Sequence, residues 1–148
     1  MSLVISDRGA CSIPDPDREE VIITGGAYTR TTVSVYSEAG WQRDLAQLTQ
    51  GRRHHACSSF THDGENVMSF VITTTQKLHF TIFQHLIVTG GWDVSNTNLD
   101  TTEVFSFSDN AWTDAGKLPA GMAEMRAATI NNRVLLFGNK DHLITYKI

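Results

Sequence analysis

The chain has 148 residues, 41% of them hydrophobic and 19% charged, which suits one globular domain with its own core. Its formal net charge is −4, and the one dense basic run, Arg52 to His55, is too short to line a nucleic-acid groove. No stretch approaches the roughly 20 apolar residues that span a bilayer, and the N-terminal segment lacks the long apolar core of a secretory signal. We therefore expect no nucleic-acid or membrane partner, and we take the cytoplasm as the default location.

The first predicted strand, Arg8 to Ile13, contains an arginine followed by small residues. Residues 14–20 combine two prolines with four carboxylates, which could suggest a cation site but is more simply explained as a solvated loop. An apolar strand, Val21 to Gly26, ends in a glycine pair, and an alternating strand then leads to a tryptophan at Trp41. Short extended segments separated by turns indicate β-structure.

The same order of elements returns further along the chain. The second copy has an arginine-rich start at Arg52 to Ser59, an apolar strand ending in a glycine pair at Leu86 to Gly91, and an aromatic segment at Thr101 to Trp112. A third, weaker copy comprises Met125 to Ile130 and Val134 to Asn139, with an asparagine in place of the second glycine. No stretch has convincing helical periodicity, so the repeats predict an all-β fold.

An arginine and small-residue strand, an apolar strand ending in Gly-Gly, an aromatic strand and a tryptophan, in that order, resemble the kelch repeat. The resemblance covers nearly the whole chain from Arg8 onward. It implies a kelch-type β-propeller of four-stranded antiparallel blades: blade one at about residues 8–45, blade two at about 53–115 and a partial blade three at about 126–148. Known propellers close with about four to eight blades. We therefore expect residues 1–148 to form part of a propeller whose ring is not closed.

Glycine pairs and tryptophans form the expected framework of the repeat. A glycine pair lets the backbone turn through conformations closed to other residues. The tryptophans offer large apolar faces that would be buried between neighbouring blades. The framework residues are Gly25, Gly26, Trp41, Gly90, Gly91, Trp112 and Gly138.

The second copy is longer than the first because of an apparent insertion. Gly25 and Gly90 lie 65 residues apart, whereas Gly90 and Gly138 lie 48 apart. Removing the 18 residues 67–84 restores the pattern, since 65 − 18 leaves a spacing of 47. Two explanations stay open. The first is a retained intron translated in frame, which fits because the codons of the first valine and of the final Phe-Gln can contain splice signals. The second is a genuine loop insertion.

Histidines and cysteines are the residues that could carry chemistry. His54, His55 and His62 invite a metal interpretation, but adjacent residues on a strand point to opposite faces and no zinc-type spacing is present. Cys11 and Cys57 occupy equivalent places in neighbouring blades, where we expect two small buried residues, with a disulfide or redox pair as the alternative. Because no catalytic motif occurs, we expect no metal, no cofactor and no enzymatic activity.

The resemblance implies a protein-interaction module, because kelch propellers bind partners on a face formed by their loops. Arginine and tryptophan often supply contact energy. The loop residues that we expect to contact a protein partner are Arg30, Arg52, Arg53, Trp92 and Asp93. A fragment of a substrate-recruiting adaptor would fit kelch proteins generally. Two alternatives stay open: a fragment of a propeller-scaffold enzyme or sugar-binding protein, and a truncated gene product without independent function.

Overall fold

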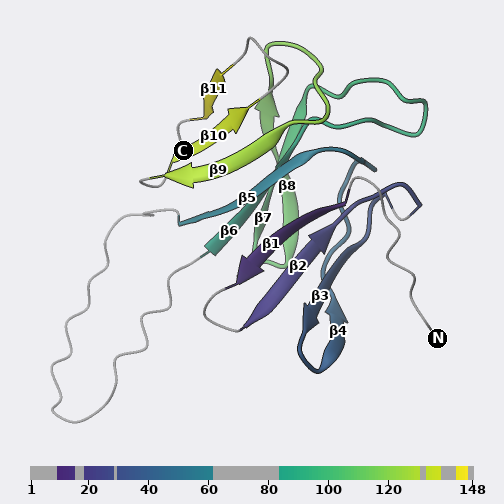
Figure 1. The fold of residues 1–148 in the computed structure, drawn as a ribbon, viewed down its shortest axis with the longest axis vertical. Helices are drawn as coiled ribbons and strands as arrows, with labels where there is room; N and C mark the ends of the chain where they lie inside the picture. Colours follow the sequence, from purple (N-terminus) through teal and green to yellow (C-terminus); the bar gives the residue numbers. More distant parts are fainter. Residues whose placement is uncertain are drawn as a thin grey trace, which may run out of the picture.

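The computed structural model of the chain describes residues 10–15, 19–28, 30–61, 84–130, 133–137 and 143–146. Within these ranges every regular element is a β-strand, which confirms the all-β prediction. The strands form three antiparallel sheets that follow one another along the chain (Figure 1).

The first sheet pairs its strands in sequence order: β1 (Cys11–Asp15), β2 (Glu20–Thr24), β3 (Val33–Ser37) and β4 (Gly40–Asp44). Because side chains alternate between the two faces of a strand, each β2–β3 pair belongs to one face. Ile22 lies opposite Val35, and both side chains are buried against the rest of the molecule. Val21 lies opposite Tyr36 on the other face, which is more exposed.

The second sheet repeats this order with β5 (Ala56–Thr61), β6 (Gln84–Thr89), β7 (Thr101–Ser106) and β8 (Ala111–Lys117). It lies between the other two sheets, so both of its faces are covered. Leu86 and Ile87 are neighbours that point to opposite faces, and each is almost fully buried. The second sheet is thus the centre of the molecule.

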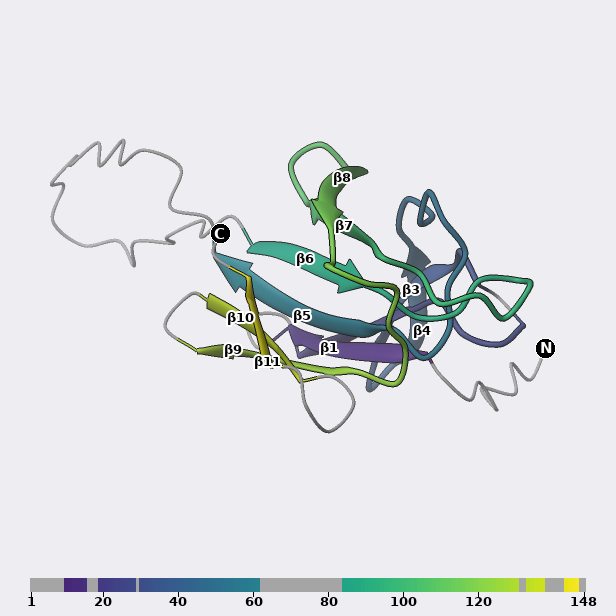
Figure 2. The same ribbon diagram turned by 90° about the horizontal axis from the view of Figure 1, so that it is seen from above.

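The third sheet contains β9 (Arg126–Ile130), β10 (Arg133–Phe137) and β11 (Leu143–Tyr146), with β10 in the middle. The first strands of the three sheets lie side by side, since β1 contacts β5 and β5 contacts β9 (Figure 2). The sheets therefore fan out from a shared inner edge.

Two apolar cores hold the three sheets together. Trp112 belongs to the core between the first and second sheets, where its indole Nε1 donates a hydrogen bond of 2.8 Å to the Ala46 carbonyl. The buried residues of this first core are Ile13, Ile22, Val33, Val35, Leu48, Cys57, Leu86, Val88, Phe105 and Trp112. The buried residues of the core between the second and third sheets are Ala56, Phe60, Ile87, Leu118, Met125, Val134 and Leu136.

Among the described residues, no strand of the first sheet contacts a strand of the third. The three sheets therefore form an arc, and the prediction of an unclosed ring is confirmed. One face of the first sheet and one face of the third remain at the ends of this arc.

Each glycine pair marks the end of a second strand, β2 or β6. Gly25, Gly26, Gly90 and Gly91 all have positive φ angles, which suit glycine far better than residues with a Cβ atom. The hydrogen bonds are also equivalent, because Gly25 donates to the carbonyl of Thr32 just before β3 and Gly90 donates to that of Thr101 at the start of β7. Gly138, the third predicted framework position, lies outside the described residues.

The predicted insertion, residues 67–84, falls almost entirely outside the described residues. Its last residue is an exception, because Gln84 is the first residue of β6 and pairs with Thr61 of β5. The segment that connects β5 to β6 is therefore residues 62–83. The choice between a retained intron and a genuine loop stays a prediction.

Candidate functional site

The loop after β2 and the loop after β6 meet at one surface, although they are distant in sequence. The guanidinium of Arg30 in the first loop donates a hydrogen bond to the backbone carbonyl of Asp93 in the second. The backbone of Arg52 donates a hydrogen bond of 2.9 Å to the carbonyl of Arg30, so the segment between the two sheets joins the same surface. Residues from three separate parts of the chain therefore lie in one place.

Arg53 and Trp92 are the centre of this surface. Their backbones form an isolated antiparallel bridge, and the guanidinium carbon lies 5.0 Å from the centroid of the indole ring, in a cation–π arrangement. The ring of His54 lies 4.9 Å from that indole. The guanidinium also donates a hydrogen bond of 2.5 Å to the side-chain oxygen of Asn96. These contacts hold two long side chains in fixed positions.

The side chain of Asp93 shapes its own loop instead of extending into solvent. Its Oδ1 accepts hydrogen bonds from the backbone amides of Ser95 at 2.7 Å and Thr97 at 2.9 Å. The indole Nε1 of Trp92 donates to the side chain of Asn98 at 2.5 Å. The loop is therefore held by its own polar side chains, which is typical of aspartate and asparagine in turns.

Two apolar side chains that the sequence interpretation missed extend from the same loops. Tyr28 is 85% exposed, and Val94 is also strongly exposed. The available signal for Tyr28 was an aromatic residue two positions after a glycine pair. We call the set Tyr28, Arg30, Arg53, Trp92 and Val94 the loop surface.

The placement of Arg52 corrects its prediction as a partner-contacting residue, because its side chain is fully buried. The guanidinium forms an ion pair of 2.5 Å with Glu103 of β7 and donates to the carbonyl oxygens of Gly90 and Thr101. Burial lowers the pKa of Arg52, while the charge of Glu103 opposes this shift. Arg52 is therefore a structural residue of the junction between the first and second sheets.

The Glu103 carboxylate fixes the segment that connects the first sheet to the second. Its Oε2 accepts hydrogen bonds from the backbone and the hydroxyl of Thr49, at 2.7 and 2.6 Å. Its Oε1 accepts a longer hydrogen bond of 3.3 Å from the backbone amide of Gln50. One carboxylate thus joins β7 to the connecting segment and to Arg52.

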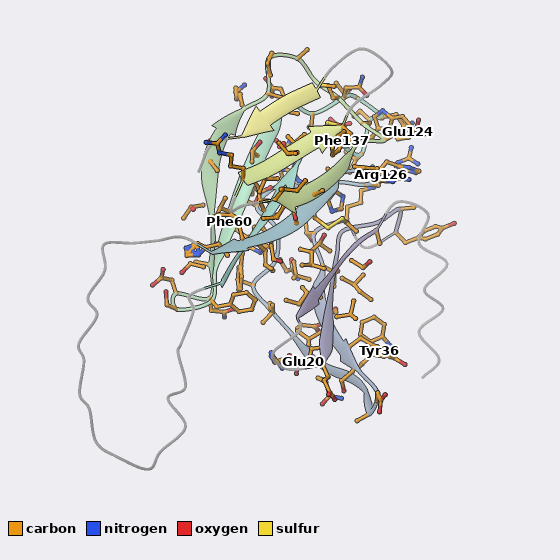
Figure 3. All side chains as sticks on the ribbon, turned by 60° about the vertical axis from the view of Figure 1, so that its left-hand side comes forward. Glu20, Tyr36, Phe60, Glu124, Arg126 and Phe137 are labelled. Atoms are coloured by element: carbon orange, nitrogen blue, oxygen red, sulfur yellow. A yellow bond between two sulfur atoms is a disulfide. The ribbon has the colours of Figure 1, made fainter. Side chains whose placement is uncertain are left out.

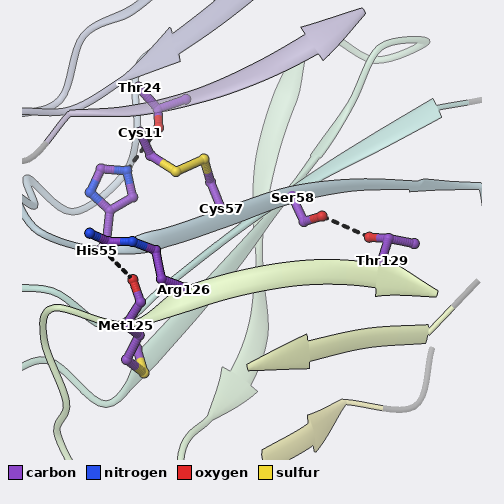
Figure 4. The surroundings of a disulfide bond; sticks show 8 residues. All are labelled: Cys11, Thr24, His55, Cys57, Ser58, Met125, Arg126 and Thr129. Carbon is purple, nitrogen blue, oxygen red and sulfur yellow. Dashed lines mark hydrogen bonds between the residues drawn. A yellow bond between two sulfur atoms is a disulfide. The ribbon is translucent and has the colours of Figure 1, made fainter. Parts of the chain in front are cut away.

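A disulfide joins Cys11 of β1 to Cys57 of β5, with the two Cα atoms 6.0 Å apart (Figure 4). The expectation of two free, buried cysteines was therefore wrong, and the alternative of a disulfide is correct. The bond borders a pocket of about 450 Å³ at the shared inner edge of the sheets. The other residues that line this pocket are Ala10, Ser12, His54, His55, Ala56, Met125, Arg126 and Ala127.

The strand register explains why the two sulfur atoms meet. Cys11 lies opposite Thr24, whereas in the second sheet Ala56 lies opposite Thr89, the equivalent threonine before the glycine pair. Cys57 is thus one residue further along its strand than Cys11, so the two side chains belong to opposite faces of their sheets. Truly equivalent positions, as the sequence suggested, would point in the same direction and could not bond.

His55 is buried beside this disulfide and is neutral at neutral pH. Burial, followed by electrostatic interaction with Arg52 and His54, lowers the pKa of His55 to about 3. Its Nε2 lies 2.8 Å from the hydroxyl of Thr24, which links the second sheet to the first (Figure 4). His54 instead contacts Trp92, so the two adjacent histidines point apart, and His62 lies outside the described residues.

Stacked antiparallel sheets whose strands run in sequence order are consistent with the blades of a propeller-type repeat protein. A comparison with protein families matches residues 84–119 to the Kelch motif, a range that begins with β6 and ends just after β8. The chain therefore contains a kelch motif, its two four-stranded sheets are consistent with kelch blades, and the predicted resemblance is confirmed. A comparison with curated protein sequences finds no match. Within the described ranges, no helix is long and apolar enough to cross a membrane.

Proposed function

We propose that the chain is a kelch-repeat protein-interaction module that binds a protein partner through the loop surface. Kelch repeats commonly mediate protein binding, and aromatic and arginine side chains are enriched where proteins bind one another. The loop surface offers Tyr28 and Val94 to solvent and holds Arg53 against Trp92. The observation that carries the proposal is this convergence of two loops and an inter-sheet segment on one rigid surface.

Rigidity supports the proposal because ordering side chains at an interface costs about 0.5–1.5 kcal/mol for each long side chain. The hydrogen bond from Arg30 to Asp93 and the packing of Arg53 on Trp92 supply that order before a partner arrives. Binding without catalysis also fits the absence of a catalytic motif from the sequence. A role as part of a substrate-recruiting adaptor would be one instance of this function.

The test is affinity capture with matched variants. The full chain, the double variant Tyr28→Ser/Val94→Ser and the control Thr113→Ser, on an exposed position of β8, are immobilised and exposed to the same cell extract. A partner is accepted only if the purified protein binds the full chain in a direct titration. We expect the double variant to weaken that binding by about tenfold or more, as loss of two interface anchors would.

The control should retain full affinity because Thr113 lies away from both loops. A purified partner that binds the double variant as tightly as the full chain would place its binding elsewhere and overturn the proposal. Failure of every captured protein to bind in the direct titration would overturn it as well.

A further inference from the structure

The face of the first sheet that points away from the second sheet is apolar and aromatic. Tyr36 lies opposite Val21 on β2 and opposite Trp41 on β4, so these residues share this face. The rings of Tyr36 and Trp41 meet edge to face, with centroids 5.4 Å apart. We call Val21, Ile23, Tyr36 and Trp41 the leading face, because it precedes the first core along the stack (Figure 3 labels Tyr36).

The second sheet carries the same pair of aromatic positions. Phe105 lies opposite Leu86 and opposite Trp112, which is the pairing of Tyr36 with Val21 and Trp41. The glycine pairs give the same alignment, because Leu86 stands five residues before Gly91 as Val21 stands five before Gly26. Tyr36 and Phe105 are therefore equivalent, and so are Trp41 and Trp112.

The two aromatic pairs differ in what covers them. Phe105 is 0% exposed and Trp112 is 7% exposed, because the first sheet packs on them. Tyr36 is 41% exposed and Trp41 is 38% exposed, because no sheet among the described residues covers the leading face. The prediction that Trp41 is buried between two sheets is thus wrong for a single copy of the chain. At the equivalent position in the second sheet, however, another sheet covers Trp112.

The chain itself carries a surface of the kind that covers such a position. On the third sheet, Val134 and Leu136 point into the core between the second and third sheets, so Leu135 and Phe137 belong to the outer face. Ile130 lies opposite Arg133 on that outer face, and both Ile130 and Phe137 are exposed. We call Ile130, Leu135 and Phe137 the trailing face (Figure 3 labels Phe137).

Repeat equivalence and charge both match the trailing face to the leading face. The segments VLLFG and VIITG align Leu135 with Ile22, which fills the first core against the second sheet. The outer face of the third sheet also carries the exposed arginines Arg126 and Arg133. The leading face carries Asp44, whose carboxylate accepts a hydrogen bond of 2.6 Å from Ser34. Apolar surfaces with opposite charges at their margins suit a specific contact.

We propose that two copies of the chain associate head to tail, with the trailing face of each copy packed on the leading face of the other. A contact between two different surfaces closes into a ring when the rotation between copies permits it. Three sheets from each copy would then surround one axis, within the range of four to eight blades in known propellers. This pairing covers both ends of the arc at once and does not involve the loop surface.

Two single variants and their mixture test this geometry. Trp41→Glu disables the leading face and Ile130→Glu disables the trailing face, while Val94→Glu, on the loop surface, is the control. Sedimentation velocity of the full chain over a concentration series should show a monomer–dimer equilibrium. Each face variant should raise the dimer dissociation constant by roughly thirtyfold, and the control should not change it.

The mixture distinguishes head-to-tail pairing from pairing of like faces. Trp41→Glu retains its trailing face and Ile130→Glu retains its leading face, so an equimolar mixture should form a heterodimer through one intact contact. If Ile130→Glu alone still dimerises, the leading faces pair with each other and the proposal is wrong. A wild-type chain that stays monomeric throughout the series would also overturn it.

Folding of each variant is checked by circular dichroism, and Tyr36→Lys and Phe137→Lys replace any variant that fails to fold. Val94→Glu should lose partner binding and keep the dimer. Retained partner binding in this variant would contradict the proposed function alone, whereas a weakened dimer would contradict the head-to-tail contact alone.

Discussion

The ion pair between Arg52 and Glu103 is buried at the junction between the first and second sheets. Both side chains are at most 3% exposed, and the guanidinium donates to backbone carbonyls as well as to the carboxylate. A buried ion pair adds little net stability over an apolar pair, but loss of one partner leaves the other as an uncompensated charge. These two residues therefore depend strongly on each other.

Glu103→Ala should lower the free energy of unfolding by about 3–5 kcal/mol, because the Arg52 guanidinium would stay buried without its carboxylate. Urea denaturation measures the change. Asp100→Ala is the control, since it removes an exposed ion pair with Lys117 and should cost at most about 1 kcal/mol. Equal decreases in the free energy of unfolding for the two variants would show that water reaches the Arg52 guanidinium when Glu103 is absent.

Residue identity alone did not predict which arginine would be buried. Arg52 and Arg53 are adjacent in a basic run, and only the backbone directions decide that one points into the junction and the other across Trp92. Tyr28 was missed because an exposed aromatic residue has no periodic signal. By contrast, the predicted strand boundaries correctly placed four residues in loops: Arg30, Arg53, Trp92 and Asp93. The roles of these residues in binding stay predictions.

At the scale of an element, β2 and β6 both end at a point where another segment of the chain approaches the backbone closely. A Cβ atom on Gly90 would overlap the carbonyl oxygen of Met122 and the side chain of Met125. A Cβ atom on Gly25 would overlap the carbonyl oxygen of Arg52 in the same way. The glycine pairs are thus required both by their φ angles and by the chain that crosses them.

Gly90→Ala should destabilise the chain by about 1–3 kcal/mol more than Gly116→Ala, a typical cost of forced overlap. Both glycines have positive φ, but a Cβ atom on Gly116 would meet nothing within 4 Å, so this variant reports backbone strain alone. Thermal unfolding of the two variants, followed by circular dichroism, gives the difference. Similar unfolding temperatures would mean that the segment at Met122 can move aside at little cost.

Strand order and strand ends could be predicted because alternation, glycine pairs and turns are local signals. The register between strands could not, because it depends on how each hairpin pairs. A shift of one residue moves every side chain to the other face. Cys11 and Cys57 show the difference: their surrounding letters align, yet their partners across the sheet, Thr24 and Val88, do not.

At the scale of the whole molecule, the disulfide adds a covalent link between two sheets that are also joined by a core, an ion pair and hydrogen bonds. It connects residues 46 apart in sequence. A cross-link over such a distance stabilises a folded chain by about 2–4 kcal/mol, mainly by restricting the unfolded state. Disulfides persist in oxidising surroundings, so the stability of this chain should depend on its redox environment.

Reduction should therefore lower the unfolding temperature of the chain markedly, because the unfolded state regains conformational freedom. Thermal unfolding with and without a reductant measures this, and the double variant Cys11→Ala/Cys57→Ala should be insensitive to the reductant. An unfolding temperature that does not change on verified reduction would show that the cross-link contributes nothing to stability.

The offset of one residue at the disulfide also breaks the symmetry of the repeat. By register, Ala56 stands where Cys11 stands in the first sheet, and Ala127 in the third sheet corresponds to Cys57 in the second. The junction of the first and second sheets and the junction of the second and third sheets therefore have the same geometry. The first contains the sulfur atoms of Cys11 and Cys57, and the second contains the methyl groups of Ala56 and Ala127. In the oxidised chain, the first and second sheets form a covalent unit that cannot be separated. Any exchange of sheets between copies would be confined to the junction of the second sheet with the third.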